Sequence, residues 1–210
     1  MNNTRKKKAK ISTKVIYVFL SILAVIYLLP LLWVIYVSLK DDKTLFVSPW
    51  AMPEHLMIEN YSFAWTAGRL GVATLNSAIV CGVTLILCLL VGSMAAFAIG
   101  RMRWKLSGAM MTYFLTGMMI PVHCILIPVF TRFSKMHLTN SLTGLILPYL
   151  TLSLPITIFI MTGFFQSLPN ELFESACIDG CSIYRSFIHI ALPLSRTGLF
   201  VTGLMTFVEN

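Results

Sequence analysis

The sequence contains four long stretches without Asp, Glu, Lys or Arg, and we expect each of them to cross a membrane as a helix. They cover residues 15–39, 71–100, 106–131 and 142–165. Each is longer than the ~20 residues that a helix needs to cross about 30 Å of hydrocarbon. Only 11% of the chain is charged, against roughly 25% in a soluble domain, because a charge left in hydrocarbon is costly. The pattern predicts an all-α polytopic membrane protein that lies in a lipid bilayer.

A fifth uncharged run opens at residue 197, close to the end of the chain at residue 210. A run of this length is too short to cross the hydrocarbon. We therefore expect four full spans and a partial fifth over 197–210, in a chain that is truncated at its C-terminus.

The basic residues divide unevenly between the two sides of these spans. If the N-terminal segment 1–14 is cytoplasmic, eleven of the sixteen Lys and Arg residues fall on the cytoplasmic side and five fall outside. Short segments rich in Lys and Arg stay in the cytoplasm, so the pattern predicts a cytoplasmic N-terminus. It also places the polar loop 166–196 in the cytoplasm and the segment 40–70 outside.

The net charge of +8 raises nucleic acid as a partner. Six of the basic residues precede the first stretch, however, where such residues hold that end of the chain in the cytoplasm. No nucleic-acid-binding module accompanies them, so nucleic acid is not an expected partner.

Two cysteines, Cys177 and Cys181, have the spacing of one helix face. His189 is too far along the chain to complete a metal site with them. We expect two packed thiols, no metal and no cofactor.

Small residues recur at helical spacing in two of the stretches. One set is Gly92, Ala96 and Gly100, and the other is Gly108, Thr112 and Thr116. Close backbone approach favours helix association in lipid, so both faces are expected to pack against other helices.

Prolines mark the two later stretches, with Pro121 and Pro128 in the third and Pro148 and Pro155 in the fourth. A proline inside a span frees a carbonyl and kinks the helix. Such broken helices often line transport paths, but a kink that only shapes packing is an equal alternative at each position.

The external segment 40–70 carries the aromatic residues Trp50, Tyr61 and Trp65. Aromatic residues near a membrane boundary usually anchor at the headgroups. A docking surface for an external partner is the alternative.

The loop 166–196 has the pattern of a helix–turn–helix. Pro169 suits a first turn, Ser167 or Asn170 is a candidate cap, and Gly180 is expected to break the helix. A second helix over 182–191 is expected to end before Pro193. Two apolar faces result, which are formed by Leu172, Phe173 and Ala176 and by Tyr184, Phe187 and Ile188. They favour insertion into a groove of a partner protein, and a helix that lies flat on the headgroups is the alternative.

The spacing within this loop resembles the signature of ABC import permeases: E-A-A, three residues, G, nine residues, then I-x-L-P. The matching residues here are Glu174, Ser175, Ala176, Gly180, Ile190, Leu192 and Pro193, with Asp179 before the glycine. Ser175 replaces the middle alanine, a small-for-small change that is expected to keep the close packing.

The likeness to the carbohydrate-type permeases extends over about 150 residues. It includes 58–61 (IENY), 76–77 (NS), 127–128 (IP), 138–147 (LTNSLTGLIL), 164–165 (FF) and 168–169 (LP). The chain resembles the second permease of maltose-like importers, although Glu209 and Asn210 stand where that family often has Trp-Asn.

This resemblance implies a type I ABC importer transmembrane domain in the bacterial cytoplasmic membrane, with a permease core over 71–210. Two permeases would pair, two cytoplasmic ABC ATPase subunits would each bind one loop, and an extracellular or periplasmic solute-binding protein would deliver a sugar. The coupling helix would lie around 182–190. Glu174, Ala176, Asp179 and Gly180 would hold the loop helices at a fixed angle. Tyr184, Arg185 and Phe187 would contact the ATPase.

Nothing in the sequence indicates an enzyme. It has no G-x-x-x-x-G-K-[ST] loop, so ATP hydrolysis is expected in a partner subunit. A permease for a non-sugar solute stays open, as does a secondary transporter, which would need carboxylates inside its spans; none of the four full stretches has one. Position alone suggests four residues of the substrate path: Gly117, Met118, Tyr149 and Thr151.

Overall fold

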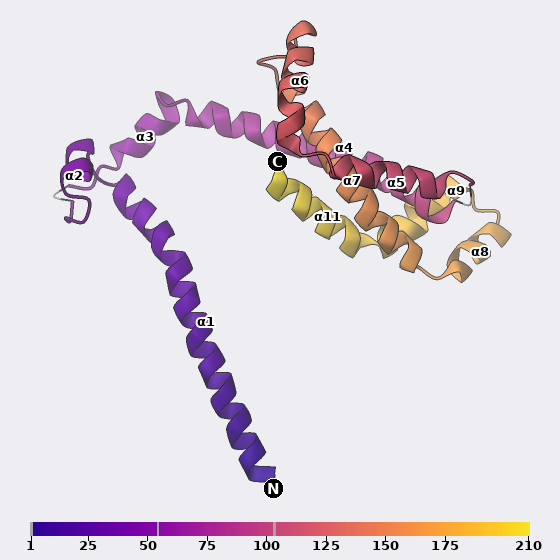
Figure 1. Ribbon diagram of the computed structural model, residues 1–210, viewed down its shortest axis with the longest axis horizontal. Coiled ribbons are helices and arrows are strands. Elements are labelled where there is room, and N and C mark those ends of the chain that lie inside the picture. Colours follow the sequence, from indigo (N-terminus) through magenta and orange to yellow (C-terminus); the bar gives the residue numbers. More distant parts are fainter. Residues whose placement is uncertain (1, 54, 103) are drawn as a thin grey trace. The chain divides into compact units, whose positions relative to one another are not determined.

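The computed structural model describes residues 2–53, 55–102 and 104–210, with side chains from residue 13 onward (Figure 1). Within this part of the chain all regular structure is helical, which confirms the all-α prediction. The chain divides into two compact units, Met1–Gly71 and Val72–Asn210.

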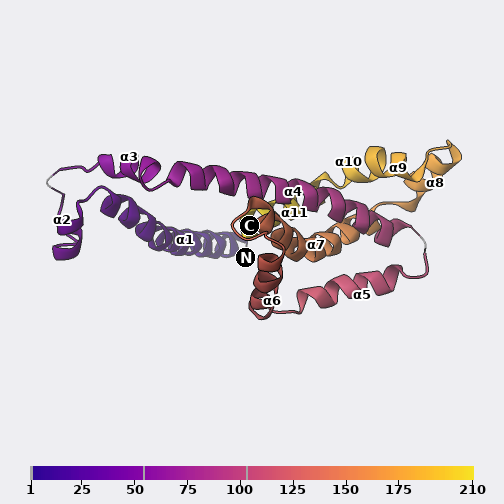
Figure 2. The same cartoon turned by 90° about the horizontal axis from the view of Figure 1, so that it is seen from above.

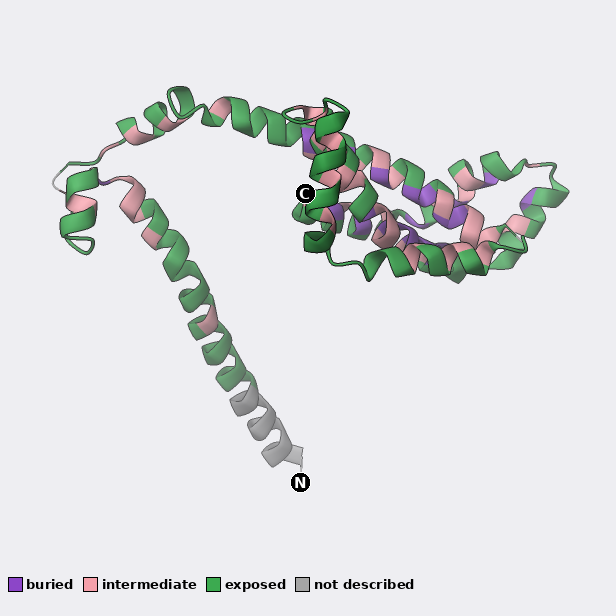
Figure 3. Ribbon diagram, turned by 45° about the horizontal axis from the view of Figure 1, so that its top comes forward, coloured by how far each residue is buried: buried purple, intermediate pink, exposed green. Residues whose placement is uncertain are grey.

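The first unit contains a long helix and a short folded segment. Helix α1 covers Asn2–Ser38, α2 covers Asp42–Val47 and α3 covers Glu59–Thr66. Within α1, Thr13–Ser38 is apolar and long enough to cross a membrane. Its side chains are exposed almost throughout (Figure 3), as expected where the surrounding medium is lipid rather than water.

The segment after α1 is tied to the end of that helix by hydrogen bonds. The ammonium group of Lys40 is buried, donates to the Pro49 carbonyl at 2.6 Å and lies 4.4 Å from the Tyr36 ring centroid. The Asn60 amide donates to the Ser38 and Lys40 carbonyls, both at 2.9 Å. The segment is therefore folded locally rather than a slack connection.

One of the aromatic residues in this segment has an aromatic partner in α1. The ring centroid of Trp50 lies 4.1 Å from that of Trp33. Trp50 nevertheless keeps 80% of its surface exposed, so both earlier interpretations, headgroup anchor and docking surface, remain predictions.

The second unit is built on long apolar helices, α4 (Leu70–Arg101, which starts at the boundary) and α7 (Leu142–Ser167), with α11 (Arg196–Glu209) packed beside α7. Both long helices meet the length and hydropathy expected of a membrane span. Figure 2 shows α5 and α11 alongside α7. Pro148 and Pro155 lie inside α7, and the helix continues through both.

The stretch 106–131 forms a bent pair rather than one straight helix. Helix α5 covers Ser107–Met118, α6 covers Val122–Lys135, and their axes differ by 92°. Pro121 stands at the break with an extended ψ of 127°. The residue before a proline is also driven out of the helical region, so the chain turns here. Whether the pair crosses the membrane stays a prediction.

Close packing between α4, α7 and α11 depends on small side chains. A Cβ atom on Gly92 would lie 2.6 Å from Thr157, and one on Gly198 would lie 2.6 Å from the Phe164 ring. The buried thiol of Cys88 and the hydroxyl of Thr157 are 3.1 Å apart. The predicted packing of the Gly92 face is confirmed, since Gly92 and Ala96 are both buried.

The second small-residue face behaves differently. A Cβ on Gly108 would meet no atom within 4 Å, and Thr112 and Thr116 are exposed. Both threonine hydroxyls donate to carbonyls of their own helix. The prediction that this face packs against other helices finds no support within the described part of this chain.

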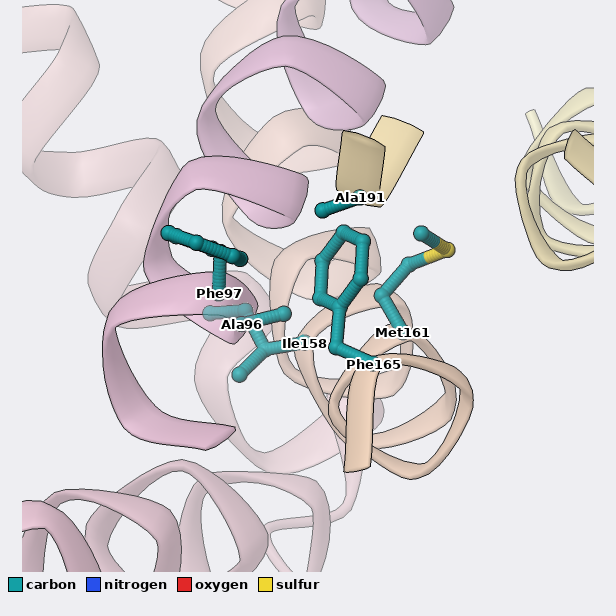
Figure 4. Close-up of a cluster of buried hydrophobic side chains, with 6 residues drawn as sticks. All are labelled: Ala96, Phe97, Ile158, Met161, Phe165 and Ala191. Atoms are coloured by element: carbon teal, nitrogen blue, oxygen red, sulfur yellow. The ribbon is translucent and has the colours of Figure 1, made fainter. Parts of the chain in front are cut away.

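Six buried side chains form the centre of the second unit (Figure 4). They come from α4, α7 and the loop that follows: Ala96, Phe97, Ile158, Met161, Phe165 and Ala191. Ala191 belongs to the 166–196 loop, so this loop is part of the core rather than an appendage.

Candidate functional site

The first helix of the 166–196 loop is α8, Asn170–Ile178. Pro169 precedes it with an extended ψ of 137°. The prediction that Ser167 or Asn170 caps the helix is wrong, because no side chain caps it. Ser167 donates to the Phe164 carbonyl, and the Asn170 side-chain oxygen accepts from Arg101.

Helix α8 ends in a Schellman turn around Gly180. The amide of Cys181 donates to the Ala176 carbonyl at 2.8 Å, and the amide of Gly180 donates to the Cys177 carbonyl at 3.0 Å. Gly180 has a φ of +73°, in the left-handed region that this motif requires and that side chains with a Cβ disfavour. A Cβ there would meet no atom within 4 Å, so backbone conformation, not space, calls for glycine.

The second helical segment is longer than predicted. It comprises α9 (Ile183–Ser186), a π turn η1 (Phe187–Ala191) and α10 (Leu192–Leu194). The prediction that it ends before Pro193 is wrong. The amide of Leu192 reaches back five residues to the Phe187 carbonyl. Pro193 then falls in α10, so the missing N–H of the proline does not end the helical segment.

Four phenylalanine rings join this loop to α4 and α7. Phe187 lies 5.2 Å from Phe97 and 6.2 Å from Phe165, measured between ring centroids, and Phe173 lies 6.1 Å from Phe97. Such tilted and edge-on pairs add stability beyond area burial. Phe187 was predicted to contact a partner ATPase, but in this chain its ring faces inward, because it packs in the core together with Ala191.

The residues of the E-A-A signature divide by exposure. Ala176 is buried, whereas Glu174 and Ser175 are exposed. The Ser175 hydroxyl donates to the Glu171 carbonyl at 2.8 Å. The alanine-to-serine departure is thus accommodated on the exposed face of the helix, and not through the close packing that was predicted.

The outer face of the loop presents the remaining predicted residues. Tyr184 keeps 74% of its surface exposed, and Arg185, Asp179 and Pro193 are exposed as well. Ile190 is half-buried, and Leu192 packs against the core. Tyr184, Arg185 and Ile188 therefore form an outward surface on an inwardly anchored helix.

Sequence reasoning missed Arg101, the last residue of α4. Its Nε donates to the Phe165 carbonyl at 2.7 Å, and its two terminal nitrogens donate to the Leu168 carbonyl and the Asn170 side chain. Its guanidinium carbon lies 4.5 Å from the Phe173 ring centroid. The only sequence signal was a positive charge at the end of a span, which carries no information about contacts 64 to 69 residues away.

A cavity of about 360 Å³ opens between α8 and α9. Its lining includes Arg101, Glu174, Cys177, Cys181 and Ser186. Among the described residues, no group of three His, Cys, Asp or Glu side chains has the geometry of a metal site. Phe97 of α4 and Ile183 of α9 also line the cavity, and Tyr184 does not.

The four residues suggested for the substrate path do not line the cavity beside α8. Gly117 and Met118 end α5 and are exposed, and Tyr149 is half-buried on α7. The Thr151 hydroxyl donates to the Leu147 carbonyl of its own helix at 2.8 Å. Their role stays a prediction.

Comparison with curated proteins finds several permeases of similar sequence. The chain is 36% identical to the diacetylchitobiose uptake system permease protein NgcG of Streptomyces coelicolor, over 88% of this chain and 61% of that protein. It is 36% identical to a putative ABC transporter permease of Caldicellulosiruptor, over 90% and 68% of the two chains. It is 32% identical to the sulfoquinovosyl glycerol transport system permease SmoH of Agrobacterium fabrum, over 92% of this chain and 68% of that protein. The chain thus spans about two thirds of their length.

Comparison with solved structures supports the fold. The chain matches one chain in the crystal structure of a bacterial ABC transporter involved in the import of the acidic polysaccharide alginate, with a TM-score of 0.81 and 17% sequence identity. The match covers 96% of this chain and 71% of the other.

The family model described as the binding-protein-dependent transport system inner membrane component matches residues 88–210, which include the whole 166–196 loop. The chain therefore belongs to this family of membrane permeases and has the type I ABC importer fold.

Proposed function

We propose that this protein is the membrane-spanning permease of a bacterial importer driven by a separate cytoplasmic ATPase, and that it moves a sugar or oligosaccharide inward. The 166–196 loop carries the proposal. It is anchored in the core on one side and presents exposed Tyr184, Arg185 and Ile188 on the other. An exposed aromatic beside an arginine is a typical anchor for a protein interface.

The orientation of the loop is supported by two separate observations. With the predicted spans, eleven of the sixteen basic residues fall on the same side as the loop, and the positive-inside rule assigns that side to the cytoplasm. The end of α4, with Arg101, contacts Leu168 and Asn170 at the end of α7 and the start of α8. If both helices cross the membrane, these ends would lie on the same side of it, where an ATPase would bind.

The packing of the loop suggests how it would transmit movement. The Schellman turn fixes α8 against α9, and the phenylalanine cluster joins both to α4 and α7. Close-packed interiors transmit displacement instead of absorbing it. A shift of the ATPase surface against Tyr184 would then tilt the spans, provided that the contacts differ between the open and closed states.

The sugar class follows from the relatives. Their names describe uptake of diacetylchitobiose, transport of sulfoquinovosyl glycerol, and transport of trehalose or maltose. The relationship implies a second permease and an external solute-binding protein as partners, since permeases of this family serve binding-protein-dependent systems. ATP hydrolysis would belong to the ATPase subunits.

The proposal is tested by uptake of labelled oligosaccharides into cells with and without the gene. Uptake should require the gene, stop when ATP is depleted and survive collapse of the proton gradient while ATP is maintained. The permease should also co-purify with an ATPase subunit. Uptake that follows the proton gradient instead of ATP would identify a secondary transporter and overturn the proposal.

A further inference from the structure

Arg101 joins three parts of the molecule through one side chain. It ends α4, and its guanidinium donates to two carbonyls at the end of α7 and to the Asn170 side chain at the start of α8. It also lies over the Phe173 ring of α8, at 4.5 Å from the centroid. Phe97, one helical turn earlier on α4, contacts the same ring at 6.1 Å. Phe173 is thereby held by two consecutive turns of one helix face.

The chemistry of this contact requires arginine. The partners are carbonyl and amide oxygens. The Phe165 carbonyl belongs to the last turn of α7, where the helix dipole places partial negative charge, and the Leu168 carbonyl follows at the C-cap. A guanidinium has five N–H donors in a planar fork, and three of its nitrogens are used here. A lysine would keep the charge, but a single ammonium group cannot span the same three acceptors or stack flat on a ring.

The backbone joins the loop directly to α7, but it does not join the loop directly to α4. Leu168 and Pro169 alone separate α7 from α8, so any rotation of α8 is passed to α7 by the backbone. Helix α4 is distant in sequence, so a rotation of α8 reaches it only through side-chain contacts. Phe97 and Phe173 supply a non-directional contact between them, and Arg101 supplies the directional one, because its hydrogen bonds fix the angle as well as the distance.

We propose that Arg101 is a positioning residue that makes α4 move with the 166–196 loop, so that ATPase closure drives α4 as well as α7 and α11, which the backbone joins to the loop. This inference rests on the proposed function. It predicts that loss of Arg101 separates ATP hydrolysis from transport, while the permease still assembles with its ATPase.

The test uses the assembled transporter in proteoliposomes and measures solute moved per ATP hydrolysed, at matched amounts of complex. Arg101→Met should lower this ratio about fivefold or more, the usual scale of coupling between sites. Arg101→Lys should fall between Arg101→Met and the unaltered protein. Asn170→Ala weakens the same contact from the loop side and should lower the ratio without altering α4. The carboxylate in Asn170→Asp still accepts a hydrogen bond from Arg101, so this variant should keep the ratio of the unaltered protein.

Lys105→Met is the matched control. It removes a positive charge four residues after Arg101 in the sequence, from a lysine whose side chain is exposed. A ratio that stays normal in Arg101→Met, with only less complex recovered, would reduce Arg101 to a structural role and overturn the inference. An equal fall in Lys105→Met would also overturn it, since local charge would then explain the effect. If the unaltered complex shows no ATP-dependent uptake, the proposed function itself has failed.

Discussion

The 166–196 loop and the bent pair α5–α6 lie in the same unit of the chain, and both carry aromatic residues, a glycine and hydroxyl side chains. They differ in what covers them. The loop contributes Ala176, Ser186, Ala191 and Ser195 to the buried set, whereas α5 and α6 contribute none. In lipid, exposure of an apolar helix costs little, since the tails are as apolar as its side chains. The loop instead packs part of its apolar surface against α4 and α7, through the rings of Phe173 and Phe187, and leaves Ile178 and Ile188 exposed.

From this difference in packing we infer separate roles for the two regions. The loop is suited to transmitting force because it is joined to the core by rings, a rigid turn and the Arg101 contact. The α5–α6 pair, bent by 92° at Pro121, keeps most of its residues exposed. The predictions that follow each pair a change in the loop or its anchor with a matched change in α5 or α6.

The largest expected effect is on the anchor of the loop. Phe165→Ala removes a fully buried ring that contacts Phe97 and Phe187, and we expect it to lower the free energy of unfolding by about 3–5 kcal/mol. Phe130→Ala, on the exposed side of α6, should change it by less than about 0.5 kcal/mol. Denaturant unfolding of the purified permease measures both. Comparable losses would show that α6 is covered in the folded protein.

The next effect concerns binding rather than stability. Tyr184→Ala should weaken binding of the ATPase subunit by about 2 kcal/mol, roughly 30-fold, as expected for an exposed aromatic anchor at an interface. Tyr113→Ala, similarly exposed on α5, should leave that affinity unchanged. Titration of labelled ATPase onto permease in nanodiscs reports the affinity. Normal binding by Tyr184→Ala would remove Tyr184 from the interface.

A smaller effect is expected from backbone conformation. Gly180→Val places a β-branched residue at a φ of +73°, which should destabilise the turn by about 1–2 kcal/mol and lower transport per ATP hydrolysed. Gly108→Ala, in α5, has free space for its methyl group and should be neutral or slightly stabilising. Proteoliposome transport with parallel ATPase measurement distinguishes them. Full coupling in Gly180→Val would show that the Schellman turn is dispensable.

The smallest effect should be the same in both regions. The Ser175 and Thr116 hydroxyls each donate to a carbonyl four residues earlier in their own helix, at 2.8 and 2.9 Å, and both side chains are exposed. Ser175→Ala and Thr116→Ala should each change stability by less than about 0.5 kcal/mol and leave uptake intact. A marked loss of uptake in Ser175→Ala alone would mean that its hydroxyl contacts a partner.

Much of the fold could be predicted because membrane helices are specified locally. Long uncharged stretches predicted α1, α4 and α7, and Gly180 predicted the turn in the loop. Local reasoning was less successful at helix ends. It assigned a cap to Ser167 or Asn170 and a stop to Pro193, whereas a π turn carries the helix to Leu194.

The candidate site was predicted in outline but not in orientation. Helical spacing identified Tyr184, Phe187 and Ile188 as one apolar set, yet the structure turns Phe187 inward and leaves Tyr184 exposed. Spacing along a helix shows which residues are neighbours on its surface. It does not show where the facing helix lies, and the π turn shifts the register further.

The sequence by itself determined that this chain is a polytopic helical membrane protein, where its charge asymmetry lies and which loop carries the permease signature. Those properties depend on composition and spacing within single segments. Only the tertiary structure decided that the loop is anchored by Phe97, Phe165 and Phe187, that Arg101 connects α4 to α7 and α8, and that α5 and α6 meet at a sharp bend. These contacts join residues far apart in the chain, and their geometry depends on how whole helices pack.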